Sequence, residues 1–129
     1  AVFSAFCDAE IAMSAHVLFE AIDPYSPAST SKKLMDIIRN DIKFSGLLIS
    51  DDISMAALPG DIKKRTKSLI EAGNDVILHC NGKLFEMKEI IESGVVPNTL
   101  TLSRMASVIE ERKKIEHNKI ENLESSQSS

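Results

Sequence analysis

The sequence is organised around one stretch, Gly46-Leu47-Leu48-Ile49-Ser50-Asp51-Asp52-Ile53-Ser54-Met55. Its run Leu47–Ile49 is apolar without polar alternation, which is typical of a parallel strand buried on both faces. Two carboxylates follow this run at once, at the carboxyl edge of the expected sheet, where α/β proteins place their chemistry. Ser and Asp are also favoured at helix starts, so both acids have a second interpretation as cap or turn residues. On pattern alone the cap interpretation comes first.

Composition excludes several classes of protein. The chain has 129 residues, enough for one modest domain, and its net charge of −4 offers no basic surface for nucleic acid. No apolar run approaches the ~20 residues of a membrane helix, and the first residues lack the basic and apolar regions of a signal peptide. Cys7 and Cys80 have no metal-like spacing, which predicts reduced thiols and a cytoplasmic protein. The missing initiator Met hints at a piece of something longer.

Strand and helix patterns alternate along the chain. We expect strands at 11–15, 47–51 and 76–78, and helices at 32–41, 62–72, 83–93 and 101–117. Ser31 and Asp61 are expected to cap the first two helices, and Gly73 to end the second. Such alternation predicts βαβ units and a parallel sheet.

Three strands make a poor free-standing domain, because a small open parallel sheet leaves two bare edges. A (β/α)8 barrel takes about 250 residues, so three units are what its final portion would supply. The predicted fold is therefore α/β, a partial (β/α)8 TIM barrel formed by the last three βα units. Residues 1–118 form this portion, and 119–129 form a polar disordered tail.

Several boxes in collinear order resemble one family. They are Met13–Val17, Ala21–Pro24, Pro27–Ser29, Gly46–Met55 and Ala72–Leu78. Together they resemble the bacterial β-N-acetylglucosaminidases of glycoside hydrolase family 3, the single-domain cytoplasmic enzymes of peptidoglycan recycling. The resemblance covers roughly residues 5 to 115, and the Ser-Asp-Asp-x-Ser-Met box is its specific part. Because of this resemblance, a catalytic role at the Asp51-Asp52 pair is now favoured over the cap or turn interpretation.

The resemblance implies a (β/α)8 barrel, with this chain matching its sixth to eighth units. It also implies hydrolysis of terminal β-linked N-acetylglucosamine from peptidoglycan-derived muropeptides, with retention of configuration and no cofactor. The family nucleophile corresponds to Asp51. A retaining glycosidase needs an ionised carboxylate held rigidly below the anomeric carbon to form the covalent glycosyl-enzyme. The end of a strand in a packed barrel provides that rigidity.

Other residues of the boxes have two interpretations each. The family match places His16 beside the sugar site, and a structural histidine with satisfied hydrogen bonds is the alternative. Met55 resembles a family Met near the sugar pocket, and apolar filling under the loop explains it as well. Asp52 is expected to point away from Asp51 and to orient the loop or cap the following turn, rather than to act as a second catalytic carboxylate.

Three further polar positions carry weaker expectations. Asp23 is expected to fix the loop after the first strand rather than to bind ligand. His79 and Asn81 end the third strand on the functional side, where ligand contact is the less favoured interpretation.

The chain lacks part of the family's machinery. The resemblance implies an acid/base His, supported by an Asp, on a loop of pattern K-H-x-x-G-H-G, and no such pattern occurs in these 129 residues. Losing a general acid/base costs about two to four orders of magnitude in rate. The chain alone is therefore expected to be inactive or nearly so.

Three alternative hypotheses place the chain in other functional classes. The first is a non-catalytic truncated remnant, or a fragment that packs on a partner, with exposed barrel edges that favour self-association. The second is a receiver-like signalling domain, disfavoured because no Asp ends the third strand. The third is a magnesium site on Asp51 and Asp52, disfavoured because adjacent acids rarely chelate one ion and Ile53 and Met55 offer no oxygen.

Overall fold

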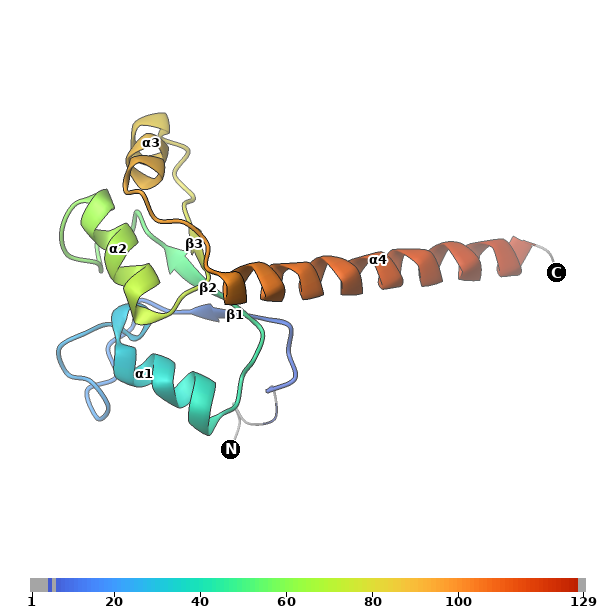
Figure 1. Ribbon diagram of the computed structural model, residues 1–129, viewed down its shortest axis with the longest axis horizontal. Helices are drawn as coiled ribbons and strands as arrows, with labels where there is room; N and C mark the ends of the chain where they lie inside the picture. Colours follow the sequence, from blue (N-terminus) through green and yellow to red (C-terminus); the bar gives the residue numbers. More distant parts are fainter. Residues whose placement is uncertain (1–4, 6, 128–129) are drawn as a thin grey trace. The chain divides into compact units, whose positions relative to one another are not determined.

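The computed structural model describes residue 5 and residues 7–127 (Figure 1). In chain order its elements are β1 (Ile11–Ser14), a 3₁₀ turn (Ala28–Thr30), α1 (Lys32–Asp36), a π-helical turn (Ile37–Asp41), β2 (Leu47–Asp52), α2 (Ile62–Ala72), β3 (Val76–Leu78), α3 (Leu84–Glu92) and α4 (Thr99–Gln127). The order of strands and helices is the predicted one. The chain divides into two compact units, one ending at Pro97 and one beginning at Asn98. The expected domain boundary at 118/119 stays a prediction.

The three strands form one parallel sheet in the order β1-β2-β3, with β2 in the centre. Ile11 pairs with Leu47 and Ser14 with Ser50 across the first ladder, whereas the second ladder has a register irregularity between Ile49 and Asp52. The parallel arrangement confirms the predicted α/β class and is that of a partial barrel.

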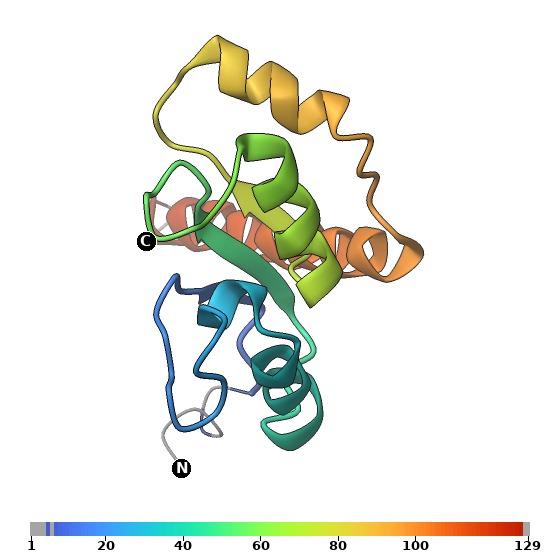
Figure 2. The same ribbon diagram turned by 90° about the vertical axis from the view of Figure 1, so that its left-hand side faces the viewer.

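Helices α1 and α2 lie against one face of this sheet, which we call the covered face (Figure 2). Met35 of α1, Leu48 of β2 and Ala72 of α2 meet there with Phe44, and Ala12 of β1 packs on the same cluster. A second apolar cluster joins Ile53, Leu58 and Leu69, with Ile77 of β3 and Ile90 of α3 packed against it. These clusters bury the apolar stripes of the helices, which is the main source of their stability.

The helix boundaries follow the predicted capping chemistry. The Ser31 hydroxyl accepts from Leu34 N at 3.2 Å, and the Asp61 carboxylate accepts from Lys64 N at 2.8 Å. Gly73 ends α2 with φ of 125°, a conformation that a residue with a side chain adopts at a cost. The first helix widens into a π turn after Asp36, so the predicted helix 32–41 is helical throughout but not α-helical to its end.

The start of β2 is fixed by a partly buried ion pair between Arg39 and Asp75, which the sequence analysis did not assign. Asp75, just before β3, accepts from Leu48 N at 2.9 Å and from the Arg39 guanidinium at 2.8 Å. Arg39 also donates to the carbonyls of Phe44 and Gly46. A Cβ at Gly46 would collide with the backbone oxygen of residue 10, so glycine is required where β2 starts beside β1.

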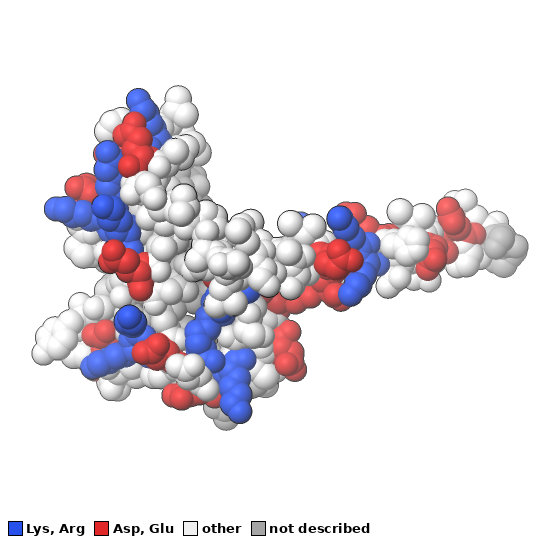
Figure 3. Space-filling model, in the orientation of Figure 1, with Lys and Arg blue, Asp and Glu red and all other residues white. Residues whose placement is uncertain are grey.

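Helix α4 extends to Gln127, so residues 119–127 are helical where a disordered tail was predicted; residues 128–129 lie outside the described part. Its sequence mixes strong helix formers with polar pairs one turn apart, which support an exposed helix. Lys114 pairs with Glu111, and His117 Nε2 lies 3.3 Å from Glu121. Both charge signs occur along it (Figure 3). No helix within the described residues has the length and apolar character needed to cross a bilayer.

Candidate active site

The carboxyl ends of the three strands lie at one edge of the sheet because the strands are parallel. A direct contact shows this closeness. His16, two residues after β1, bonds through Nε2 to the carbonyl oxygen of Asp52 at the end of β2, at 2.9 Å. The third strand ends at Leu78, whose carbonyl accepts from Ile53 N at 2.9 Å. The predicted site residues of the first two strands, and the loop after the third, are therefore neighbours.

Asp51 is held by its own backbone. Its Oδ1 accepts from the amide of Asp52 at 2.8 Å, and its carbonyl accepts from the Ser50 hydroxyl at 2.8 Å. Ser50 is fully buried and also accepts from Leu78 N, which ties this point of β2 to β3. Within the described residues no side chain donates to the Asp51 carboxylate, which is half-buried. One of its oxygens is therefore available to a ligand.

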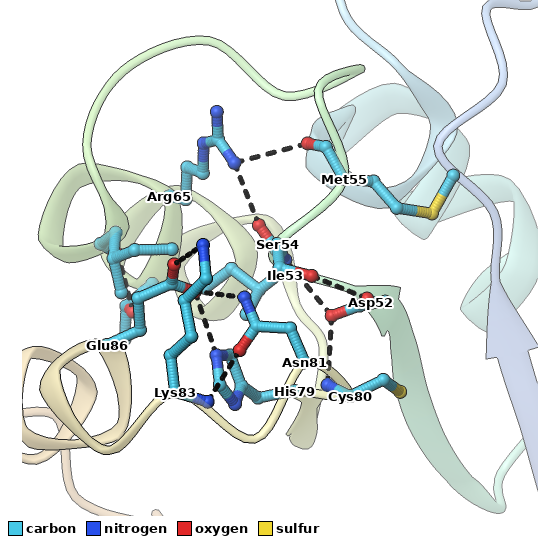
Figure 4. A network of polar contacts seen from close by, with 12 residues as sticks. Asp52, Ile53, Ser54, Met55, Arg65, His79, Cys80, Asn81, Lys83 and Glu86 are labelled. Carbon is cyan, nitrogen blue, oxygen red and sulfur yellow. Dashed lines mark hydrogen bonds and ion pairs between the residues drawn. The ribbon is translucent and has the colours of Figure 1, made fainter.

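Asp52 is bonded quite differently from its neighbour. One oxygen accepts from the amides of Ser54 and Cys80, and the other accepts from the Ser54 hydroxyl at 2.6 Å (Figure 4). Partial burial raises the pKa of this carboxyl, but the hydrogen bonds from Ser54 and Cys80, with the charge of His79, outweigh it and lower the pKa below 3.8. This confirms the prediction that Asp52 orients the loop after β2.

His16 has both ring nitrogens engaged. Nδ1 lies 2.6 Å from the Ser29 hydroxyl, Nε2 bonds to Asp52 as above, and the residue is 8% exposed. The ring thus joins the segment after β1, the 3₁₀ turn and the end of β2. Contact of His16 with substrate stays a prediction, and it requires one of these two bonds to be exchanged for a bond to sugar.

The loop after β2 presents Met55 to solvent. Met55 is 42% exposed, so part of it is accessible to a ligand and part of it is covered by the loop and its neighbours. Its backbone amide donates to Asp52 O at 3.1 Å. The predicted sugar contact of Met55 is untested by this geometry.

Arg65 of α2 is a residue of the site that the sequence analysis missed. Its guanidinium donates to the carbonyls of Ile53 and Met55 at 3.0 and 3.1 Å (Figure 4). It also donates to the carbonyl of Gly60 at 2.9 Å. One side chain therefore holds both ends of the loop that follows Asp52. A basic residue on a lysine-rich helix gives no sequence signal for this role, because its partners are backbone oxygens.

The residues after β3 form a local polar cluster (Figure 4). His79 Nε2 lies 2.9 Å from Glu86, which also accepts from Asn81 at 2.7 Å and pairs with Lys83. The hydrogen bond from His79, followed by that from Asn81, lowers the pKa of Glu86. His79 Nδ1 is buried without a hydrogen-bond partner among the described residues. Asn81 is engaged within this cluster, and ligand contact at either residue stays untested.

Two further polar residues hold the loops that support the edge. Asp23 accepts from the amides of Tyr25 and Ser26 and from the Ser31 hydroxyl, which confirms that it fixes its own loop. The Ser31 bond, first among these, lowers the pKa of Asp23.

The second is Asn74, which the sequence analysis left without a role. It is buried, accepts from the Ser14 hydroxyl, and donates to the carbonyls of Ser29 and Leu69 at 2.7 Å each. Its amide thus connects β1, the 3₁₀ turn and α2 under the site. An Asn between a helix-ending Gly and a strand looks like a turn residue, so only the packed structure reveals this role.

A search of the described residues for metal-ligand clusters and cavities gives two results. Within them no three His, Cys, Asp or Glu side chains are close enough together to hold an ion. A cavity of about 250 Å³ lies between the loops after β1 and β2, with Tyr25, Pro59 and Arg65 in its lining. That lining does not include Asp51. The edge therefore offers a carboxylate and its supports, which can supply nucleophilic or electrostatic chemistry.

Comparison with known proteins settles the family. Residues 1–110 match the model of the glycosyl hydrolase family 3 N terminal domain. The chain belongs to glycosyl hydrolase family 3.

A β-hexosaminidase of Nitrosomonas eutropha is 42% identical over 71 residues, which is 54% of this family 3 chain and 20% of that protein. The chain thus spans about a fifth of the curated relatives it matches.

Solved structures agree with this assignment. A β-N-acetylhexosaminidase from Beutenbergia cavernae aligns with TM-score 0.63 and 28% identity over 69% of this chain and 28% of that one. NagZ from Neisseria gonorrhoeae, solved in complex with zinc ion, aligns with TM-score 0.56 and 33% identity over 71% of this chain and 26% of that one. The fold is that of part of the barrel domain of this family, as the resemblance predicted.

Proposed function

We propose that this chain supplies the nucleophile of a retaining β-N-acetylglucosaminidase, with Asp51 as the nucleophilic carboxylate. The substrate is a terminal β-linked N-acetylglucosamine of a peptidoglycan-derived muropeptide, processed in the cytoplasm. The observation that carries the proposal is the position of Asp51 at the carboxyl end of the central parallel strand. Its Oδ1 accepts from the amide of Asp52, which leaves the other carboxylate oxygen to attack the sugar. The names of the relatives, β-hexosaminidase and β-N-acetylhexosaminidase, support an amino-sugar substrate.

The arrangement gives each residue a task. Asp51 attacks the anomeric carbon, and its fixed Oδ1 keeps the attacking oxygen pointing in one direction. Asp52 and Arg65 hold the backbone on either side of the loop, which keeps Asp51 from following loop motion. Met55, exposed on the loop after β2, is the residue proposed to pack on the sugar. Proton transfer to the leaving oxygen needs a group that these 129 residues do not provide in the family's pattern.

The chain alone is therefore expected to turn over a chromogenic N-acetylglucosaminide at least about a hundredfold more slowly than a complete family 3 relative, because the general acid/base is missing. Turnover equal to that of the relative would overturn this expectation. The second candidate function, a non-catalytic fragment that packs on a partner, is favoured by the exposed side chains of β1.

The nucleophile is tested by covalent trapping. A fluorinated N-acetylglucosamine donor with an activated leaving group needs little acid catalysis, so it reports the first step of the reaction alone. Mass spectrometry of the chain mixed with the remaining barrel portion of a relative should show one added sugar on Asp51. Asp51→Asn should abolish the adduct, and the matched variant Asp52→Asn should still form it. An adduct on Asp52, or on neither residue, contradicts the proposal.

A further inference from the structure

The cavity between the loops after β1 and β2 has the composition of a small ligand site. Leu58, which is 2% exposed, and Pro59 line it with apolar surface. Ser26 of the first loop and Ser68 of α2 add hydroxyls, and Arg65 adds a guanidinium. Apolar walls with a few polar groups are typical of sites that bind small molecules. The volume of about 250 Å³ lies just below that of pockets for drug-sized ligands, so it suits a small organic group.

Arg65 brings unused hydrogen-bond donors to this cavity. A guanidinium has several N–H groups in a fixed planar arrangement. In Arg65 the Nε group donates to Gly60 O, and Nη1 donates to the carbonyls of Ile53 and Met55. Within the described residues Nη2 has no hydrogen-bond partner. The N–H groups of Nη2 therefore remain available, on a guanidinium that its other bonds hold in place.

The charge of Arg65 has no counter-ion among the described residues. The side chain is partly buried, and the oxygens that it contacts belong to neutral carbonyls. Asp23 lies on the loop that carries Ser26, but its carboxylate accepts from the amides of Tyr25 and Ser26 and from the Ser31 hydroxyl. A partly buried cation that is bonded only to neutral groups favours the binding of an anion, because its charge is only partly solvated.

The rest of the lining favours a carboxylate as this anion. The hydroxyls of Ser26 and Ser68 have no partner within the described part of the chain, so they can donate to an acceptor oxygen. Phosphate sites gather several backbone amides or cations. This lining instead combines one cation with the apolar surface of Leu58 and Pro59. Such a lining fits a singly charged carboxylate attached to a small apolar group, which is the C-terminal end of a short peptide.

We propose that this cavity binds the terminal carboxylate of a short peptide. Arg65 Nη2 donates to one carboxylate oxygen, and the hydroxyls of Ser26 and Ser68 are available to the other. The source of the peptide rests on the proposed function, because a muropeptide carries a peptide in addition to its sugars. The cavity lining does not include Asp51, and Arg65 also holds the loop that follows Asp51. The peptide end therefore binds beside the sugar site and favours substrates that carry a peptide.

The test is a titration of the isotope-labelled full chain, followed by amide chemical shifts in nuclear magnetic resonance spectra. The ligand is N-acetyl-alanyl-alanine, and the matched ligand is the same dipeptide as its C-terminal amide. The free acid should shift the amides of Ser26, Thr30 and Ser68 with a dissociation constant on the order of 1 mM, as expected for so small a ligand. The amide lacks the charge and should bind about tenfold more weakly or less. Inorganic phosphate, as a third ligand, should bind more weakly than the free acid.

A charge variant tests the cavity without removing Arg65, which also supports the loop after β2. Ser68→Glu places a carboxylate one turn from Arg65 on the same lining, where it can accept from Nη2 itself. Ser68 is exposed on α2, so the variant should fold. It should weaken binding of the free acid by about tenfold or more. The matched control is Ser107→Glu, the same change at an exposed position of α4 outside the lining, and it should leave binding unchanged.

Each outcome decides the proposal. Binding of the free acid that is lost in the amide and in Ser68→Glu supports it. No shift at the three amides, equal binding of acid and amide, tighter binding of phosphate, or binding unaffected by Ser68→Glu overturns it.

Two further ligands identify the source of the peptide. A muropeptide with a free peptide carboxylate should shift the same three amides, and the same sugars without the peptide should not. A muropeptide that leaves these amides unshifted overturns its peptide as the ligand. Carboxylate binding without a sugar adduct on Asp51 overturns the proposed function alone, and an adduct without carboxylate binding overturns this inference alone.

Discussion

The two faces of the same sheet differ in how far their side chains are buried. On the covered face Leu48 is 1% exposed among residues from two helices, and the polar groups there, such as Ser14 and Asn74, are bonded to each other. The opposite face carries Ile11, Met13, Ile49 and Val76, and we call it the open face. There Met13 is 59% exposed, on a strand that pairs only with β2 within the described residues. The covered face is therefore packed by this chain's own helices, whereas the side chains of β1 on the opposite face are exposed.

The largest expected effect comes from truncating one apolar side chain on each face. Leu48→Ala should lower the free energy of unfolding by about 3–5 kcal/mol, because it leaves a cavity in a packed core. Met13→Ala should change it by about 0.5 kcal/mol or less, since an exposed side chain loses little. Urea denaturation of both variants measures this. Equal losses would mean that the open face is already covered in solution, and the comparison would fail.

A smaller effect is expected for the polar network of the covered face. Asn74→Ala should cost about 1–3 kcal/mol, because the Ser14 hydroxyl and the carbonyls of Ser29 and Leu69 lose their buried partner. Thermal and urea unfolding provide the measurement. The control is Asn40→Ala at an exposed position, which should be nearly neutral. If Asn74→Ala left the free energy of unfolding unchanged, water would be replacing the amide, and the covered face would not be tightly packed.

At the carboxyl ends of the strands, Asp52 should make the free energy of unfolding depend on pH. Its pKa is lowered in the folded chain from 3.8, so the unfolded state binds more protons in the window just below that value. The stability that Asp52 contributes is therefore present above about pH 3.8 and is lost as pH falls through the lower folded pKa.

Comparing wild type with Asp52→Asn by urea unfolding between pH 3 and pH 7 isolates this residue, because the other shifted carboxyls are common to both chains. The advantage of the wild type should be constant near neutral pH and shrink toward the acidic end. An advantage that grows on acidification would show that the hydrogen bonds from Ser54 and Cys80 do not favour the charged form.

The smallest expected change in stability is at the proposed nucleophile. Asp51→Asn keeps an oxygen to accept from the Asp52 amide, so the free energy of unfolding should change by about 0.5 kcal/mol or less. The same variant should nevertheless abolish the covalent sugar adduct in the mixed complex. A large loss of stability would indicate that Asp51 has a structural role comparable to that of Asp52, and it would weaken the assignment of the nucleophile.

Local patterns were sufficient for much of the fold. The apolar run before Asp51, the caps Ser31 and Asp61 and the stop at Gly73 each depend on neighbours within a few residues, and the structure confirms them. The last helix was predicted to end at residue 117, whereas it extends to Gln127. Its final residues are mostly polar, and a polar segment without a clear apolar stripe is typical of a disordered tail.

The residues that hold the candidate site in place could not be predicted from local sequence patterns. Arg65 bonds to carbonyls that any sequence would provide, and Asn74 bonds to residues up to 60 positions away, so neither leaves a local signature. Asp52 was predicted as an orienting residue, but its link to the Cys80 amide across the sheet required the strands to be placed side by side.

The amino-acid sequence by itself determined the parallel α/β class, the family and the carboxylate proposed for the chemistry, because these depend on the order and spacing of short motifs. Only the tertiary structure decided which aspartate is saturated with hydrogen bonds, which histidine is engaged on both nitrogens, and which face of the sheet stays open. Burial and hydrogen bonding between distant segments set those properties, and they exist only once the chain has brought the segments together.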